Sequence, residues 1–384
     1  MKVVIAPDSF KESLSAAEVA AALAEGWRLA LPDTEVVELP LADGGEGTTQ
    51  ALVSATGGSL EHKEVSGPLG KPVNGFWGRL GGKRAVIECA AASGLDLLSR
   101  GERDPWRATT RGTGELILEA LDAGMTEIII GLGGSATNDG GAGMLQALGV
   151  RLRDENGDDI APGAEGLESL ASIDLSGLDK RLRGVSFQVA CDVDNPLTGE
   201  QGASAVFGPQ KGADAALVKR MDACLARYGE AITHCIGEKV DTIPGAGAAG
   251  GLGAAFLAFL NASLKPGIEI MLDAVDIDSH LEGAALVITG EGRIDSQTER
   301  GKTPVGVARR ARMHSIPCIA VGGAVPEDPQ VLQTLSHQGL KAVFPILPGV
   351  TDLDTALANA GLNLRLCGRN LAAFWQLAAI QPAD

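Results

Sequence analysis

A glycine-rich segment lies between a β-branched run at residues 128–130 and an apolar pattern at helical spacing. A glycine loop between a strand and a helix lets backbone amides point at a bound anion. This loop also carries hydroxyl, amide and carboxylate side chains, which suit a phosphate together with a metal ion or a polyol. The alternative is a tight turn, but a plain turn rarely needs so many polar groups. The candidate phosphate-binding residues are Gly131, Gly133, Gly134, Ser135, Asn138 and Asp139.

A second polar segment, residues 8–11, directly follows the first expected strand. Lys11 can meet a phosphate or carboxylate as a point charge, while Asp8 and Ser9 can bind a hydroxyl group or, for the carboxylate, a metal ion. Taken alone, the segment fits equally well a turn that leads into a helix and leaves the lysine in solvent. A binding role for this segment therefore depends on support from the other motifs.

Two further segments contain pairs of carboxylates. Asp43 and Glu46 lie beside flexible glycine backbone at an expected helix start, where ordinary capping is an equal alternative. Asp192 and Asp194 follow an apolar strand and could bind Mg²⁺, or one of them could serve as a general base. An Asp-x-Asp pair alone is weak evidence, and the other ligands of a calcium loop are not at the required offsets.

Basic residues accompany the carboxylates in two later loops. Lys211 adds a cation after the Asp-x-Asp pair, and Glu291 and Arg293 are followed by Lys302. The last group resembles a Walker A motif, but the opening glycine would fall at Ser296, so the chain has no P-loop. Arg293 and Lys302 are nevertheless good partners for phosphate.

Residues 245–253 form a glycine-alanine run that contains the GxGxxG pattern of dinucleotide-binding proteins. No strand leads directly into this run, because residues 241–244 are too short and contain a proline. A nicotinamide-dependent dehydrogenase is therefore disfavoured. We expect a flexible hinge or a close approach of backbone to a ligand.

Strands and helices alternate at both ends of the chain, which implies a parallel sheet covered on both faces. Ligands bind such sheets at the carboxyl ends of the strands, where the polar segments fall. The expected strands are residues 3–6, 35–41, 284–289, 317–321 and 342–346. The expected helices are residues 15–31, 46–56, 304–314, 328–337 and 351–370.

The middle of the chain is glycine-rich, and residues 73–79 and 83–89 form an expected hairpin around Gly81 and Gly82. The sequence therefore predicts an α/β fold with two α/β domains and the active-site cleft between them. The first is a Rossmann-like parallel-sheet domain of residues 1–60 plus 284–384. The second is a mixed α/β domain, residues 61–283, inserted into it.

Composition narrows the class of partner. The net charge of −17 argues against nucleic acid and anionic membranes, and 3% aromatic residues supply few platforms for stacking bases. The six cysteines lack CxxC spacing, as expected in a reducing compartment. The five histidines lie outside the glycine motifs, so a zinc site or Ser-His-Asp triad is poorly supported. We find no secretory signal and no run long enough to span a membrane.

Six motifs together resemble the bacterial type-1 glycerate kinase family, in order and up to about residue 350. They occupy residues 6–11, 42–48, 131–141, 190–196, 207–212 and 289–295. Glu12 departs from the pattern, since glycine is expected after Lys11, and it adds negative charge beside that lysine. The resemblance implies two α/β domains and ATP-dependent phosphorylation of D-glycerate, with Mg²⁺, in the cytoplasm. The implied product is 2-phosphoglycerate, feeding lower glycolysis from glycolate, glyoxylate or sugar-diacid breakdown.

The resemblance also suggests roles, because phosphoryl transfer depends mainly on positioning and charge neutralisation. The glycine loop would cradle the ATP phosphates, and Asp192, or with less support Asp139, would accept the proton of the substrate hydroxyl. The candidate catalytic residues are Asp192, Lys11, Asp43 and Arg293. The candidate ATP-binding residues are Gly131, Gly133, Gly134, Ser135, Asn138, Asp139 and Lys302. The candidate substrate-binding residues are Asp8, Ser9, Lys211 and Glu291, and the candidate metal ligands are Asp194 and Glu291.

Several alternatives stay open. A glycerate 3-kinase, or another kinase of small hydroxy acids or polyols, would need much the same groups. Residues 131–136 resemble the loop of the galactokinase-homoserine kinase group, although the doubly wound rhythm does not fit that fold. A non-catalytic sugar-acid sensor is a different class, and the density of carboxylates with basic residues argues against it. Both a monomer and a homodimer are compatible with the sequence.

Overall fold

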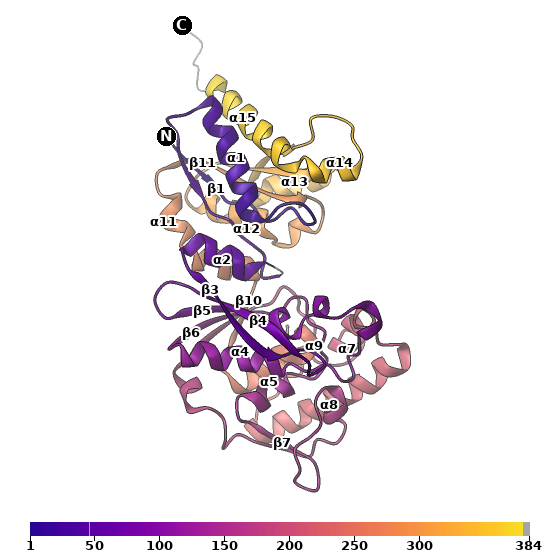
Figure 1. Ribbon diagram of the computed structural model, residues 1–384. Helices are drawn as coiled ribbons and strands as arrows, with labels where there is room; N and C mark the ends of the chain where they lie inside the picture. The colour runs from indigo at the N-terminus through magenta and orange to yellow at the C-terminus, as the bar shows by residue number, and fades with distance from the viewer. Residues whose placement is uncertain (46, 379–384) are drawn as a thin grey trace. The chain divides into compact units, whose positions relative to one another are not determined.

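The computed structural model describes residues 1–45 and 47–378, and it divides into two compact units (Figure 1). The first unit contains residues 1–43 and 54–56 and the chain from Ile268 onwards. The second contains residues 44–53 and 57–267. Each unit has its own principal sheet and its own buried apolar core.

The sheet of the first unit has five parallel strands in the order β13-β12-β11-β1-β2. The strands are β1 (Lys2–Ile5), β2 (Glu35–Glu38), β11 (Ala284–Arg293), β12 (Cys318–Ala324) and β13 (Leu340–Pro345). From β1 the chain moves to β2 on one side, whereas β11, β12 and β13 follow one another on the other side. The strand order therefore reverses between β1 and β11, and in open α/β sheets this switch point opens a crevice at the carboxyl ends of the strands.

The helices of the first unit are α1 (Ala16–Ala30), α10 (Gly267–Ala274), α11 (Ile277–Leu281), α12 (Thr303–Met313), α13 (Pro329–Gln338), α14 (Leu353–Ala358) and α15 (Ala360–Ala378). The predicted capping box opens α1, because the Ser15 side chain accepts from the Glu18 amide and the Glu18 carboxylate accepts from the Ser15 amide. Helices α1 and α15 lie side by side (Figure 1). Glycine permits this contact, since a Cβ at Gly26 would be 2.0 Å from the Arg365 carbonyl oxygen.

The second unit contains a six-stranded mixed sheet in the order β10-β9-β6-β5-β4-β3. The strands are β3 (Ser59–Ser66), β4 (Pro72–Arg79), β5 (Arg84–Glu88), β6 (Glu127–Gly131), β9 (Ser186–Ala190) and β10 (Ser263–Lys265). Strands β5, β6, β9 and β10 are parallel, whereas β3 and β4 are antiparallel additions at one edge. A separate two-stranded sheet joins β7 (Arg151–Arg153) to β8 (Ser172–Asp174).

The helices of the second unit cover this sheet and frame its loops. They are α3 (Ala90–Ser93), α4 (Arg111–Asp122), α5 (Ala142–Ala147), α6 (Ala164–Leu167), α7 (Ala203–Phe207), α8 (Ala215–Ile236) and α9 (Ala248–Phe259). Helix α2 (Thr48–Thr56) is divided between the two units. The short 3-10 helices are η1 (Leu95–Leu97), η2 (Arg100–Glu102), η3 (Lys180–Gly184) and η4 (Pro209–Lys211) in the second unit and η5 (Thr298–Arg300) in the first.

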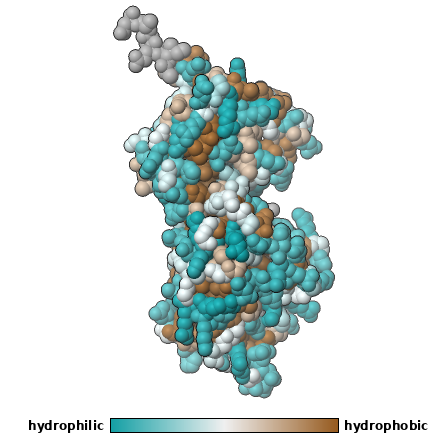
Figure 2. Space-filling model, turned by 60° about the vertical axis from the view of Figure 1, so that its left-hand side comes forward, coloured by the Kyte–Doolittle hydropathy of each residue, from teal (hydrophilic) through white to brown (hydrophobic). Residues whose placement is uncertain are grey.

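The predicted α/β class is confirmed, with one parallel and one mixed sheet. The expected hairpin is also confirmed as the antiparallel pair β4 and β5. Hydrophilic residues predominate on the face shown in Figure 2, in keeping with the net charge of −17. Within residues 1–45 and 47–378, no helix is long and apolar enough to cross a membrane.

The glycine-alanine run makes a close backbone contact within the second unit. Its backbone approaches the glycine loop, where the Gly250 carbonyl accepts from the Gly140 amide at 2.9 Å; the expected hinge and the expected approach to a ligand stay predictions. A Cβ at Gly250 would lie 2.1 Å from the Thr137 carbonyl oxygen, so only glycine fits there. The run supports the loop from one side.

Candidate active site

The predicted site residues fall into two sets, one in each unit. In the first unit they line a cavity of about 810 Å³ at the switch point between β1 and β11. The predicted residues in this cavity are Asp8, Ser9, Lys11, Asp43, Glu291, Arg293 and Lys302. Segments far apart in the sequence therefore converge, as expected for loops at the carboxyl ends of parallel strands.

Asp8 lies just beyond β1, where its amide donates to the Gly290 carbonyl at 2.8 Å. Its carboxylate accepts from the Ser9 amide at 2.6 Å and from the Thr303 hydroxyl at 2.6 Å. Burial, with a further contribution from the nearby charge of Asp43, raises the pKa of Asp8 to about 6. Asp8 is thus a fixed carboxyl group that titrates close to neutrality.

Glu291 belongs to the end of β11 and is only 8% exposed. Its Oε1 accepts from the Thr298 hydroxyl at 2.6 Å, and its Oε2 lies 3.9 Å from the Lys302 ammonium. Burial raises the pKa of Glu291 to about 7; the negative charge of Asp8 acts in the same direction, and Thr298 and Lys302 oppose it. A carboxyl group with a pKa near neutrality inside a cavity is a typical candidate for proton transfer.

The turn after Asp8 carries the departure at Glu12. The Phe10 amide donates to the Leu14 carbonyl and the Ser13 amide donates back to the Phe10 carbonyl, each at 2.9 Å. This tight turn places Glu12 at φ 64°, in the left-handed region that favours glycine. The expected glycine therefore has a conformational reason. Both Lys11 and Glu12 are exposed and line the cavity.

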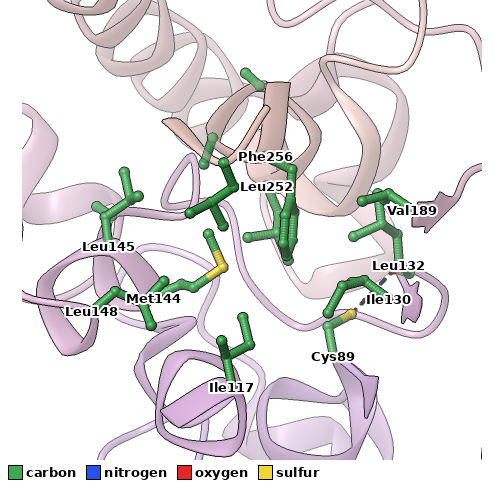
Figure 3. Close-up of a cluster of buried hydrophobic side chains, with 14 of the residues drawn as sticks. Cys89, Ile117, Ile130, Leu132, Met144, Leu145, Leu148, Val189, Leu252 and Phe256 are labelled. Atoms are coloured by element: carbon green, nitrogen blue, oxygen red, sulfur yellow. Dashed lines mark hydrogen bonds between the residues drawn. The ribbon is translucent and has the colours of Figure 1, made fainter. Parts of the chain in front are cut away.

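In the second unit the glycine loop joins β6 to α5 above an apolar layer. Figure 3 shows this layer, in which Ile130 and Leu132 lie near Val189 and the Cys89 thiol donates to the Leu132 carbonyl at 3.3 Å. At the tip of the loop Gly133 and Gly134 are exposed. The amides of these two glycines make no hydrogen bond within the part of the chain that the structure describes. They are therefore available to an anion.

Asp139 is fully buried beneath the loop. Its carboxylate accepts four hydrogen bonds: from the amide and hydroxyl of Thr110 at 2.8 and 2.9 Å, and from the amides of Gly141 and Gly143 at 3.1 and 3.2 Å. Burial raises the pKa of Asp139, and these hydrogen bonds oppose the shift. Asp139 thereby connects the loop to the starts of α4 and α5.

Two more side chains connect the loop to the segment that contains α7 and η4. Asn138, with no exposed surface, donates to the Ser204 hydroxyl at 2.9 Å. Lys211 is 1% exposed, and its ammonium donates to the Ser135 hydroxyl at 2.9 Å and to the Thr137 carbonyl at 2.7 Å. The predicted helix after the loop is short, since α5 spans six residues. An anion at this position would therefore contact the loop itself rather than the start of a long helix.

Two buried atoms of the loop have no hydrogen-bond partner among the described residues. They are Oγ1 of Thr137 and Oδ1 of Asn138. Buried polar atoms are nearly always paired with protein or ordered water. Unused polar capacity in the same loop that exposes free amides is consistent with a place where a ligand or water completes the bonding.

The Asp-x-Asp pair follows β9 at the same sheet edge as the glycine loop. Asp192 and Asp194 are both exposed, and Asp192 Oδ1 accepts from the Gly267 amide at 2.9 Å. Gly44 belongs to this edge too, because a Cβ there would be 2.9 Å from Ala190 Cβ. Glu46, predicted as a second carboxylate near Gly44, lies outside the described residues.

In the part of the chain that the structure describes, the carboxylates available to bind Mg²⁺ are few and do not form a cluster. Among the described residues, no group of three or more His, Cys, Asp or Glu side chains forms a ready metal site. Magnesium in phosphoryl-transfer enzymes is usually bound by only one or two carboxylates, together with substrate phosphates and waters. Asp194, exposed at the loop edge, and Glu291, in the cavity, fit that requirement in chemistry.

Comparisons with known proteins identify the family. The glycerate kinase family matches residues 3–376. A glycerate 2-kinase of Escherichia coli (strain K12) is 53% identical over 375 residues, which cover 97% of each chain. The chain belongs to the glycerate kinase family. A glycerate kinase of Bacillus subtilis (strain 168) is 52% identical over 379 residues and 98% of each chain.

A solved structure agrees with the glycerate kinase assignment. The crystal structure of a Salmonella typhimurium LT2 protein assigned as glycerate kinase 2 matches with a TM-score of 0.90 and 54% identity, covering 100% of both chains. The chain is therefore an enzyme, a phosphotransferase with an alcohol group as acceptor. The sensor hypothesis and the galactokinase-homoserine kinase hypothesis are both excluded.

Several polar residues that support the two sets of site residues are not identified from the sequence. Thr110 and Ser204 receive the loop side chains, while Thr298 and Thr303 bond the cavity carboxylates. Glu88, 5% exposed at the end of β5, accepts from the Thr49 amide at 2.6 Å. Isolated hydroxyl residues carry no pattern that singles them out. Glu88 could have been found, because a carboxylate directly after an apolar strand end is the signal that marks Asp8.

Proposed function

We propose that this enzyme is an ATP-dependent, Mg²⁺-requiring glycerate 2-kinase that converts D-glycerate to 2-phosphoglycerate. The observation that carries the proposal is the pair of exposed, unbonded glycine amides at Gly133 and Gly134 on a loop held from beneath. The name of the E. coli relative supports O2 as the phosphorylated position. A glycerate 3-kinase is the alternative.

The glycine loop binds the phosphates of ATP through the amides of Gly133 and Gly134, with Ser135 as a side-chain partner. Asn138 and Asp139, assigned to ATP from the sequence, serve the same site by fixing the shape of the loop. Backbone amides in a fixed shape stabilise phosphate charge with little reorganisation, which is what phosphoryl transfer needs.

The cavity of the first unit binds D-glycerate. Lys11, Arg293 and Lys302 supply positive charge for its carboxylate or for the transferring phosphoryl group, and Asp8 and Glu291 accept hydrogen bonds from its hydroxyls. Mg²⁺, held by Asp194 or Glu291, would neutralise phosphate charge when bound.

Asp192 is the proposed acceptor of the substrate hydroxyl proton, and Glu291, with its pKa near 7, is the second candidate. If Asp192 is the base, Asp192→Asn lowers kcat by about 10²- to 10⁴-fold while ATP binding persists. Glu291→Gln, made in parallel, separates the two candidates. The acidic limb of the pH-rate profile is set by the ionisation of the base, so only substitution of the true base should abolish that limb. A folded Asp192→Asn protein with near-normal turnover removes Asp192 from this role.

The decisive experiment follows ADP release with Mg-ATP and D-glycerate, with the product detected by enolase. Turnover that reaches enolase without a mutase identifies 2-phosphoglycerate. A requirement for added mutase moves the phosphate to O3. Absence of ADP release from a folded protein contradicts the ATP and D-glycerate assignments together, and a panel of phosphate donors and hydroxy acids then distinguishes which is wrong.

We also propose a cytoplasmic enzyme supplying lower glycolysis from glycolate, glyoxylate or sugar-diacid breakdown. All six cysteines are unpaired, as a reducing compartment would require. Fractionation of cells, with growth of a deletion strain on glycolate or a sugar diacid, tests location and pathway. Light scattering distinguishes a monomer from a homodimer.

A further inference from the structure

Lys211 is a buried cation with an unusual set of neighbours. Its ammonium is 1% exposed and donates only to neutral oxygens, the Ser135 hydroxyl and the Thr137 carbonyl. No Asp or Glu carboxylate within the described chain lies within ion-pair distance of it. Buried ammonium groups are normally paired with a negative charge, because desolvation strongly disfavours an isolated one.

The nearby titratable groups supply that charge only from a distance. Cys89 and Asp139 are the groups whose charge acts on Lys211. Burial raises the pKa of the Cys89 thiol to about 12, so the thiol is neutral at physiological pH. The Asp139 carboxylate accepts four hydrogen bonds from the loop and from Thr110 and makes none with the ammonium, so it acts on Lys211 only through space. Among the described residues, Lys211 therefore has no negative partner in direct contact, and an anion bound nearby would add to the charge of Asp139.

The contact between Lys211 and Ser135 determines which atom donates the hydrogen bond. A charged lysine can only donate, so the Ser135 oxygen must be the acceptor, and the serine proton is left to be donated elsewhere. Ser135 adjoins the exposed residues Gly133 and Gly134, whose amides make no hydrogen bond within the described chain. The ammonium thus leaves the serine hydroxyl free to donate to an anion, if one binds at the neighbouring glycine amides.

We propose that Lys211 is a positioning residue that acts as an internal counter-charge, turning the Ser135 hydroxyl towards an anionic phosphate on the outer face of the glycine loop. The proposal rests on the function proposed above, in which this loop binds phosphate. Lys211 does not touch the anion. A neutral lysine could accept the serine proton instead, so loss of its charge would withdraw both the counter-charge and the donor.

Protonation gives this arrangement a measurable signature. Burial lowers the pKa of Lys211 to about 8 in the free protein. A bound anion favours the charged lysine and raises that pKa. Binding is therefore coupled to uptake of a fraction of a proton at mildly alkaline pH, and affinity for the anion falls as the pH rises further.

The test compares Lys211→Met with Lys219→Met, which removes the same charge from an exposed position on α8. Mg-ATP is titrated calorimetrically at about pH 8.5 in buffers of different ionisation enthalpy. We expect proton uptake in the wild type and in Lys219→Met but not in Lys211→Met. We also expect KM for ATP to rise about 10- to 100-fold in Lys211→Met, with KM for D-glycerate changed less than about twofold.

Ser135→Ala provides a second variant, which keeps the lysine and removes only the hydroxyl; circular dichroism confirms that it is folded before it is compared. It should weaken ATP binding as well, and Lys211→Met should add little to it, because the two residues act through one contact. The proposal is wrong if Lys211→Met binds ATP with the same affinity and the same proton uptake as the wild type. It is also wrong if the effects of the two substitutions are fully additive.

Hydrogen exchange distinguishes this failure from failure of the proposed function. If ATP does not protect residues 131–141 in the wild type, the loop is not the phosphate site and both proposals fail. If ATP protects the loop while Lys211→Met behaves like the wild type, the role of Lys211 alone is wrong.

Discussion

In the first unit the candidate site presents side chains to the ligand, whereas in the second unit it presents backbone. The cavity is lined by Asp8, Glu291 and several basic residues, and two of its carboxyl groups have pKa values near neutrality. In the glycine loop Asn138 and Asp139 are fully buried, whereas Gly133 and Gly134 are exposed and their amides make no hydrogen bond within the described chain.

The difference shows that the same residue types can serve opposite purposes. A carboxylate that accepts four hydrogen bonds from its own loop fixes a shape, and a carboxylate with one threonine partner in a cavity remains able to exchange a proton. Substitutions in the loop should therefore alter structure first. Substitutions in the cavity should alter chemistry first.

The strongest test of this contrast is Asp139→Ala. The change leaves the buried donors of Thr110, Gly141 and Gly143 without an acceptor, so we expect the second unit to lose about 3–5 kcal/mol of stability. Hydrogen exchange read by mass spectrometry should show faster exchange around α4 and α5 and unchanged exchange in the first unit. Asp158→Ala, in an exposed turn, is the control and should change neither. Unaltered protection in Asp139→Ala would show that the loop keeps its shape without the carboxylate.

Glu291→Gln should separate stability from activity in the cavity. The folded protein raises the pKa of Glu291 from 4.5 to about 7, so the folded state binds this proton more tightly than the unfolded state. The stabilisation is complete below about pH 4.5 and is lost as the pH rises through about 7. Glutamine carries no charge, so at about pH 8 the variant should exceed the wild type in unfolding free energy by up to about 3 kcal/mol.

The same variant should lose activity, because the ionisable group is gone from the cavity. Urea unfolding in the presence of a chelator, at about pH 5 and about pH 8, measures the stability difference. A gain in stability that is equal at the two pH values would contradict the assigned pKa. Glu282→Gln, at an exposed position just before β11, serves as the control.

Gly134→Ala tests the exposed backbone more gently. Gly134 has φ 73°, and a Cβ there would lie 3.2 Å from Ala90 Cβ, so the loop must shift. Gly157 has φ 86° with open space around it, so Gly157→Ala carries a similar backbone strain without touching the loop. We expect KM for ATP to rise about tenfold in Gly134→Ala alone, a loss of about 1.4 kcal/mol. Equal kinetics in the two variants would argue against backbone recognition.

The smallest effect is expected for Glu12→Gly. Glycine adopts φ 64° without strain, so the turn should gain about 1 kcal/mol of stability. Removing an exposed negative charge beside Lys11 should also lower KM for D-glycerate by about two- to threefold at low salt, with less effect at high salt. Thermal unfolding and initial rates measure the two outcomes. Glu12→Ala is the control, because it removes the charge but keeps the strained backbone.

Much of the fold could be predicted from the sequence because the strands and helices carry strong local patterns. The capping box at Ser15 and the hairpin at β4 and β5 depend on neighbouring residues alone. The convergence of residues 8–11 and 290–295 could also be anticipated, since parallel strands place their carboxyl ends together.

The direction in which a side chain points could not be predicted in the same way. Lys211 looks like a ligand-binding lysine in sequence, and its burial beneath the loop depends on α7, η4 and the loop packing together. The supporting role of Gly250 likewise requires the contact with Thr137, more than a hundred residues away in the chain. Such long-range packing leaves no periodic signal.

The first unit is assembled from both ends of the chain, residues 1–43 and the residues from Ile268 onwards, and this affects folding during synthesis. Strand β1 pairs with β11 and β2, and α1 packs on α15. The first elements to leave the ribosome, β1 and α1, therefore lack β11 and α15 until most of the chain has been synthesised. At roughly 5–20 residues per second, the delay between β1 and β11 is roughly 15–55 s. The second unit is nearly continuous in sequence and is complete before β11 exists. A nascent chain should therefore carry a folded second unit while the apolar strand β1 still lacks its β11 partner, so that one edge of β1 stays open throughout this interval.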